Sequence, residues 1–186
     1  MSIFRRLFGR ANVHGTQKTS GSDISDLIST YLSEDWDSRY VAITELRRKH
    51  EARDTRVIVK LLDLLRDPDW EVRVKAIEIL ADGPVFWEDP RVAEPIRLAL
   101  KDDSARVRYR AAYALADMQY TPAAPDLIAA LDDDDESVQE YAVYALGEIC
   151  VPQAVQPLKR LHPTATDKVK KRIAFALDKI DRTFRT

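Results

Sequence analysis

The chain has 186 residues, of which 45% are hydrophobic, so it is long enough to bury a continuous core in one or two domains. Its 29 basic and 31 acidic side chains leave a formal charge of only -2, which provides no global field that would select DNA or an anionic membrane. The single cysteine, Cys150, excludes an internal disulfide, and the sequence has neither a long apolar run nor a secretory signal, so we expect a cytoplasmic protein.

The first 22 residues differ from the rest of the chain in charge. They contain no acid and four cations: Arg5, Arg6, Arg10 and Lys18. We expect residues 1–22 to form a basic, flexible segment and residues 23–186 to form one repeat domain. A frayed terminus is the simplest interpretation of this segment. Weak contact with a membrane surface or a partner through residues 1–10, and an organelle transit peptide, are the alternatives.

One pattern then recurs along the chain: an Asp-rich turn, the phrase Val-Arg-x-x-Ala, and a Leu four residues later. Its clearest copies run from Leu65 to Leu80, from Leu100 to Leu115, and from Leu131 to Leu146. Weaker copies cover 32–46 and 169–177. The alanine position, here called the marker, falls at residues 42, 76, 111, 142 and 173, the last being Ile. Intervals of 31 to 35 residues indicate stacked units rather than one globular fold.

Each unit has the spacing of two helices joined by a short turn. In residues 92–118, the first helical stripe contains Val92, Ile96 and Leu100, and the second contains Val107, Ala111 and Leu115. Asp103 or Ser104 is expected to cap the second helix, with Asp69, Asp135 and Thr166 in comparable positions elsewhere. Alanine at the marker allows neighbouring hairpins to approach closely. No run shows the two-residue alternation of a strand.

An inserted turn, residues 82–90, lengthens one repeat and places Phe86 and Trp87 between two units. Two interpretations remain open. The aromatic pair either anchors a partner or covers the groove between hairpins.

The frame Leu-x-Asp-x-x-x-x-Val-Arg-x-x-Ala-x-x-Ala-Leu resembles the HEAT-like repeats of the phycobilisome-lyase type, over roughly residues 24 to 181. The resemblance implies an all-α, right-handed α-solenoid of about five HEAT-like hairpins whose second helices line the concave side. Gln139 and Lys170 replace the arginine of the frame. Because the same repeat occurs in bilin lyases, deoxyhypusine hydroxylase and adaptor proteins, the resemblance does not select one function.

The sequence contains no recognisable catalytic or metal-binding motif. His50-Glu51 matches one His-Glu pair of deoxyhypusine hydroxylase, but that family needs several such pairs to hold iron. The run from Asp132 to Glu136 lacks the Gly and the distant Glu of a calcium loop, and no phosphate loop or nucleophile elbow is present. We therefore expect no catalytic residue, no metal and no cofactor.

Two sets of residues on the second helices are candidates for special roles. Arg73 and Arg108 are expected to form a structural arginine ladder by bonding to aspartates in the adjoining turns, the alternative being a cationic surface for an acidic partner. The candidate partner-binding residues are Tyr109, Tyr113, Tyr141 and Tyr144, flanked by Arg106 and Arg110, together with Phe86 and Trp87. Aromatic residues and arginine are favoured at the centres of interfaces. Alternatively, the tyrosines fill spaces between repeats.

These observations favour a non-enzymatic scaffold that binds a protein segment on the concave surface of the solenoid. The first alternative is a bilin lyase, which would make the protein an enzyme, or a chaperone-like phycobilisome-associated factor, with a phycobiliprotein or bilin as partner; it depends on the family resemblance. Nucleic-acid binding through the basic starts of the second helices is less favoured, because the total charge is close to zero.

Overall fold

The computed structural model describes residues 23–32, 36–51, 54–82, 84–87 and 89–185. The described residues contain helices and turns and no strand. The α-helices are α2 (Ile24–Leu32), α3 (Trp36–Glu51), α4 (Thr55–Leu64), α5 (Trp70–Leu80), α6 (Pro84–Trp87), α7 (Ala93–Leu98), α8 (Ala105–Asp117), α9 (Ala124–Ala129), α10 (Glu136–Glu148), α11 (Val155–Leu161) and α12 (Asp167–Phe184). Short 3-10 turns adjoin them: η1 (Ala99–Lys101), η2 (Thr121–Ala123), η3 (Ala130–Asp132) and η4 (Pro152–Ala154). The basic segment predicted for residues 1–22, with its membrane contact through residues 1–10, lies outside the described residues.

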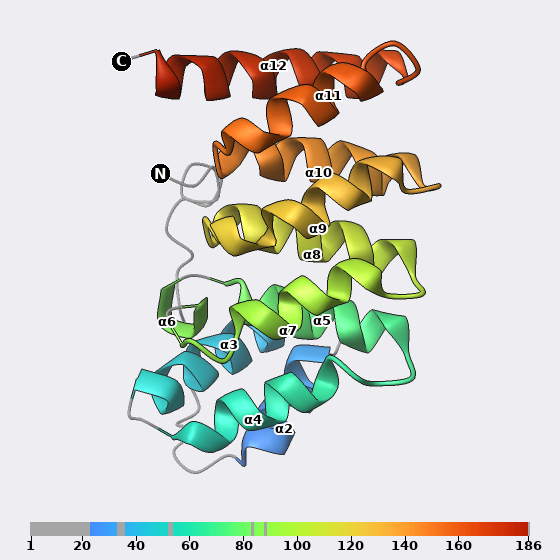
Figure 1. The fold of residues 1–186 in the computed structure, drawn as a ribbon. Helices are drawn as coiled ribbons and strands as arrows, with labels where there is room; N and C mark the ends of the chain where they lie inside the picture. Colours follow the sequence, from blue (N-terminus) through green and yellow to red (C-terminus); the bar gives the residue numbers. More distant parts are fainter. Residues whose placement is uncertain (1–22, 33–35, 52–53, 83, 88, 186) are drawn as a thin grey trace.

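The helices pair into hairpins that stack in chain order (Figure 1). The pairs are α2 with α3, α4 with α5, α7 with α8, α9 with α10, and α11 with α12. The second helices α5, α8, α10 and α12 contact one another in that order, and α8 with α10 and α10 with α12 make the most extensive contacts. The predicted all-α solenoid of about five hairpins is therefore confirmed.

The first hairpin joins the stack differently from the others. The main neighbours of α3 beyond its own hairpin are α4 and the short helix α6, which belongs to the inserted turn. In turn, α6 also packs against α5. The insertion thus mediates the contact between the second helices of the first two repeats.

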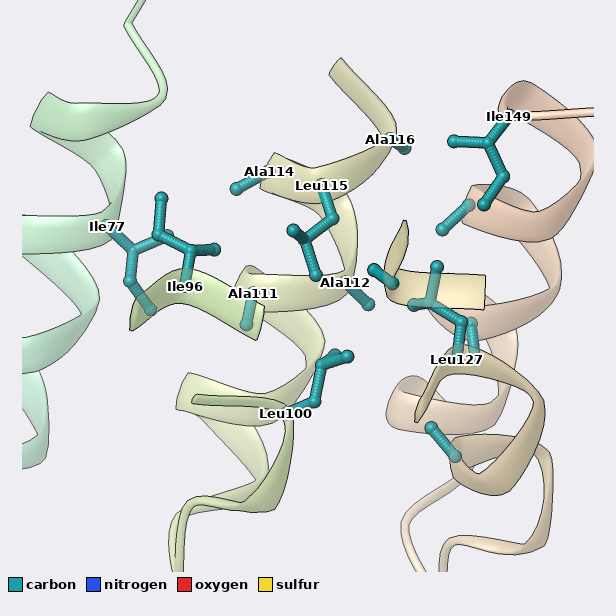
Figure 2. Packing of buried hydrophobic residues seen from close by; sticks show 14 of the residues in the cluster. Ile77, Ile96, Leu100, Ala111, Ala112, Ala114, Leu115, Ala116, Leu127 and Ile149 are labelled. Atoms are coloured by element: carbon teal, nitrogen blue, oxygen red, sulfur yellow. The ribbon is translucent and has the colours of Figure 1, made fainter. Parts of the chain in front are cut away.

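Apolar residues at helical spacing form one continuous core along the stack. The marker alanines Ala76, Ala111 and Ala142 have no exposed surface. Figure 2 shows Ile77 and Ile96 on one side of α8, and Leu127 and Ile149 on the other, with alanines of α8 pointing toward both. Because each interior side chain touches the next repeat as well as its own, the hairpins stabilise one another.

The second helices approach most closely where small residues meet. A Cβ atom added to Gly147 of α10 would lie 2.8 Å from Cβ of Ala176 of α12 and 3.0 Å from its Cα. Real Cβ atoms do not approach so closely, so a larger residue at this position would separate the two helices.

Polar residues in the turns satisfy the free amides at the helix starts. Side chains of Asp54, Asp69, Asp135 and Thr166 accept bonds from the first backbone amides of α4, α5, α10 and α12. Ser104 precedes α8 but its side chain makes no capping bond; instead, Asp102 accepts a bond from the Ser104 amide. The end of α8 is closed by Gln119 in the left-handed conformation (φ 52), with the Tyr120 amide donating to the Leu115 carbonyl.

Arg73 and Arg108 each tie their own turn to the turn of the next repeat. Arg73 donates to the carbonyls of Asp67 and Pro68, and its guanidinium bonds to both carboxylate oxygens of Asp102 at 2.7 and 2.9 Å. Arg108 repeats this pattern one hairpin later with Asp133, at 2.7 and 2.8 Å. Gln139 occupies the arginine position of the fourth hairpin and donates to the Asp133 carbonyl. Two-point bonding of this kind fixes orientation as well as distance.

These bonds change the acidity of the aspartates. Burial raises the pKa of Asp102, but the Arg73 guanidinium and the Ser104 amide outweigh it, so the pKa lies below the ordinary 3.8. Burial also raises the pKa of Asp133, but the Arg108 guanidinium and the Asp135 amide outweigh it, so this pKa is lowered too. A carboxyl with a lowered pKa stabilises the fold above the unfolded-state pKa, and this stabilisation is lost as the pH falls through the folded-state value.

Replacing Gly147 with Ala should destabilise the protein by about 1–3 kcal/mol through overpacking, although Ala is the better helix former. Ala174→Leu, on the exposed side of α12, is the control and should change stability by less than about 0.5 kcal/mol. The double variant Gly147→Ala/Ala176→Gly should recover part of the loss. Urea unfolding followed by circular dichroism measures all three, and a Gly147→Ala variant more stable than the parent would contradict the close approach.

Asp102→Asn should destabilise the protein by about 2 kcal/mol at pH 7, because Arg73 loses its two-point bond to a carboxylate and keeps only the exposed Asp103 as a charged acceptor. The difference from the parent should shrink as the pH falls below about 5, because the carboxyl of the unfolded parent is protonated first, and it should vanish below the folded-state pKa of Asp102. Asp63→Asn, at an exposed position of α4, serves as the control. Urea unfolding at pH 3, 5 and 7 provides the comparison; a difference that stays constant over this range would show that the carboxylate charge is irrelevant.

Candidate protein-binding surface

The structure brings together four tyrosines from two neighbouring second helices. Tyr109 of α8 stacks on Tyr141 of α10 with ring centroids 5.3 Å apart, and Tyr113 stacks on Tyr144 at 5.8 Å. Tyr113 also meets the edge of Tyr141 at 5.9 Å. All four rings are partly exposed. We call these four residues the tyrosine cluster.

The repeat register extends this surface onto the next helix. Tyr113 and Tyr144 each lie two residues after a marker, and the equivalent residue of α12 is Phe175. Phe175 is 59% exposed, one of the most exposed large apolar side chains among the described residues. Aromatic side chains therefore occupy one register position on three consecutive second helices.

Two arginines lie against the rings and also bond to acids. The Arg110 guanidinium is 6.0 Å from the centroid of Tyr113 and forms an ion pair with Glu78 at 2.8 Å. Arg172 lies 5.4 Å from the centroid of Tyr144 and pairs with Glu140 at 2.9 Å. Arg106, predicted to flank the tyrosines, lies over Trp70 at 4.6 Å. Such cation–π contacts are favourable and hold the rings in place.

Glu140 is a buried acid that sequence reasoning missed. Its side chain is 5% exposed and bonds to Lys168 at 2.6 Å as well as to Arg172. Burial raises the pKa of Glu140, but the two cations outweigh it, so the pKa lies below its ordinary value. Because Lys168, Arg172 and Arg110 are all paired with acids, much of the positive charge at the starts of these helices is neutralised within the protein.

A row of acids marks the other side of the tyrosine cluster, near the helix ends. Asp82, Asp117 and Glu148 each lie six residues after a marker. Sequence reasoning missed this row, although the repeat register would have revealed it. Burial, with a contribution from Glu148, raises the pKa of Asp117, while the Tyr113 hydroxyl lowers it. Burial and the charges of Glu148 and Asp117 raise the pKa of Tyr144 to about 12. Acidic side chains therefore lie beside Tyr113 and Tyr144 on this side of the cluster.

The inserted turn does not display Phe86. This side chain has no exposed surface, and its ring centroid lies 5.3 Å from that of His50 on α3. Of the two interpretations of this turn, the burial of Phe86 favours coverage of the groove between hairpins, because α6 folds back onto α3 and leaves Phe86 no surface for a partner. Trp87 is partly exposed, and its partner contact stays a prediction.

The other motifs considered in the sequence do not form a ligand site in the part of the chain that the structure describes. Within the described ranges, no group of three or more His, Cys, Asp or Glu side chains is arranged to hold a metal. Two open hollows, of about 450 and 240 Å³, lie between η4, α11 and α12 and between α2 and α4, and neither is lined by the tyrosine cluster. Among the described helices, none combines the length and apolar character needed to cross a membrane.

Comparisons with solved structures support the fold. The complex of CpcE and CpcF of phycocyanin lyase from Nostoc sp. PCC7120 aligns with a TM-score of 0.63 at 19% identity, covering 92% of this chain and 71% of that chain. A designed armadillo repeat protein in complex with the peptide (KR)4 aligns with a TM-score of 0.57 at 20% identity, covering 84% and 81%. At these identities the likeness concerns the fold alone.

Sequence-family models identify the repeats directly. The model described as HEAT repeat matches residues 57–82, and the model described as HEAT repeats matches residues 92–178. No curated protein matches the chain. The matched residues cover four of the five hairpins in whole or in part, from α4 to α12, so the chain is a HEAT-like repeat protein.

Proposed function

We propose that this protein is a non-enzymatic scaffold that binds an extended segment of a partner protein across the tyrosine cluster and Phe175. The observation that carries the proposal is the row of partly exposed aromatic rings on α8, α10 and α12, in one register position. We place this row on the concave side of the solenoid. The family resemblance supports that placement, because it implies that the second helices line the concave side of the solenoid.

The rings are suited to binding because they are already fixed. Each tyrosine of the cluster contacts another ring. Arg110 also lies against Tyr113, and Arg172 against Tyr144. A rigid aromatic surface provides large contact area without the cost of ordering flexible side chains on binding. A stack of repeats presents such side chains at regular intervals, which suits a partner in an extended conformation.

The structural neighbours support this type of function. One is a designed armadillo repeat protein seen with a bound peptide, and another was designed for modular peptide recognition. The phycocyanin lyase structure is a complex of two different chains. Binding of a protein or peptide is thus compatible with the shared fold.

A random linear peptide library displayed on phage should yield peptides that bind the protein with micromolar or better affinity. The double variant Tyr113→Ala/Tyr144→Ala should weaken binding of these peptides at least tenfold, because hot-spot tyrosines typically contribute about 2 kcal/mol or more. Leu98→Ala is the matched control, since Leu98 is 57% exposed on a first helix. Fluorescence polarisation measures affinity, and circular dichroism verifies folding. Failure to enrich any peptide, or equal binding by the double variant, would overturn the proposal.

A bilin-handling function is the second candidate, favoured by the alignment of 92% of the chain with the phycocyanin lyase complex. If this candidate is correct, mixing the protein with free phycocyanobilin, alone or with apo-phycocyanin, should shift the visible absorption of the bilin. The same mixture with serum albumin controls for unspecific uptake. An unchanged spectrum in both mixtures would remove this candidate and leave the scaffold proposal intact.

A further inference from the structure

We propose that the partner segment presents a lysine or arginine side chain to Asp117, with its alkyl stem lying along Tyr113 and Tyr144. This inference rests on the proposed function and specifies the chemistry of the partner. It assigns to Asp117 the role of a specificity-determining residue at the edge of the tyrosine cluster.

The repeat architecture supplies an internal comparison for Asp117. In the row of acids, Asp82 forms an ion pair with Arg47 of the preceding repeat at 2.6 Å. Glu148 forms one with Lys179 of the following repeat at 2.7 Å. Asp117 occupies the middle position, and it has no ion pair with any cation of the described residues. A cation supplied by a partner would complete the row in the manner of Arg47 and Lys179.

Asp117 is exposed to solvent and lies close to a second acid, Glu148. Its side chain reaches solvent, yet burial and the neighbouring Glu148 raise its pKa. Asp117 in turn raises the pKa of Tyr113 and of Tyr144. An incoming cation would relieve this accumulation of negative charge, whereas a carboxylate or phosphate of a partner would increase it.

The rings of Tyr113 and Tyr144, next to Asp117, already contact arginine side chains of the protein itself. Arg110 lies over Tyr113 and Arg172 over Tyr144, at 6.0 and 5.4 Å from the ring centroids. A lysine or arginine from the partner would combine contact with these aromatic rings and a charge pair with Asp117. Lysine and arginine are suited to this because an apolar stem precedes the charged group.

The test uses five pools of random linear peptides, each with one fixed central residue: arginine, lysine, citrulline, norleucine or glutamate. Fluorescence polarisation should show that the arginine and lysine pools bind the parent protein about tenfold more tightly than the citrulline and norleucine pools. The preference should weaken as salt is raised, since charge pairs that reach solvent are screened. The glutamate pool should bind most weakly.

Variants of the protein test whether Asp117 causes the preference for arginine and lysine. Asp117→Asn should bring the arginine and lysine pools down to the level of citrulline and norleucine, and Asp117→Lys should reverse the order in favour of glutamate. Asp132→Asn, which removes one exposed acid from another turn, is the matched control and should keep the parent preference. Circular dichroism establishes that each variant is folded.

The outcomes separate this inference from the proposed function. Equal binding of the arginine and norleucine pools, lost in Tyr113→Ala/Tyr144→Ala, would overturn the role of Asp117 while the binding surface remains. A cation preference that survives Asp117→Asn would also overturn it. Binding of no pool to the parent would overturn both.

Discussion

The distance between neighbouring second helices is the constraint on which the rest of the structure depends. Small buried residues set it: Ala111 and Ala142 at the markers, and Gly147 against Ala176. At this spacing, tyrosines one repeat apart stack with centroids 5.3 and 5.8 Å apart, and Arg73 and Arg108 reach aspartates in the next turn. A wider spacing would break the ring contacts and the arginine bonds together, because both are made at fixed register across the same helix pairs.

Charge is distributed unevenly over the two ends of the second helices. At their starts, Arg110, Lys168 and Arg172 bond to acids of their own stack, so their charge is already balanced. At their ends, Asp82 and Glu148 are balanced by neighbouring repeats and Asp117 is not. The aromatic surface therefore lies between a neutralised basic side and an acidic side with one carboxylate available. If a partner segment binds there as proposed, such asymmetry would favour one direction of the segment as well as one composition.

The hairpins and their order could be predicted from sequence because the marker and its flanking apolar residues repeat. The same register aligned Tyr113 with Tyr144, since equivalent residues of stacked repeats become neighbours. Contacts between non-equivalent positions were harder to foresee. Glu140 gave no signal of burial, because its cations belong to the following repeat and an acid on a helix normally faces water. The two interpretations of Phe86 stayed open because the sequence does not reveal in which direction an inserted turn folds.

The insertion at α6 has a consequence for how the protein opens. Stacked repeats are stabilised mainly by their immediate neighbours, so local opening begins where the contact between repeats is least continuous. The later second helices touch along their lengths, whereas α3 meets the rest largely through α4 and the short α6. We therefore expect the N-terminal hairpin to open before α8, α10 and α12 separate. Transient unfolding at that end of the molecule would then leave the tyrosine cluster and Phe175 in place, since they lie on α8, α10 and α12.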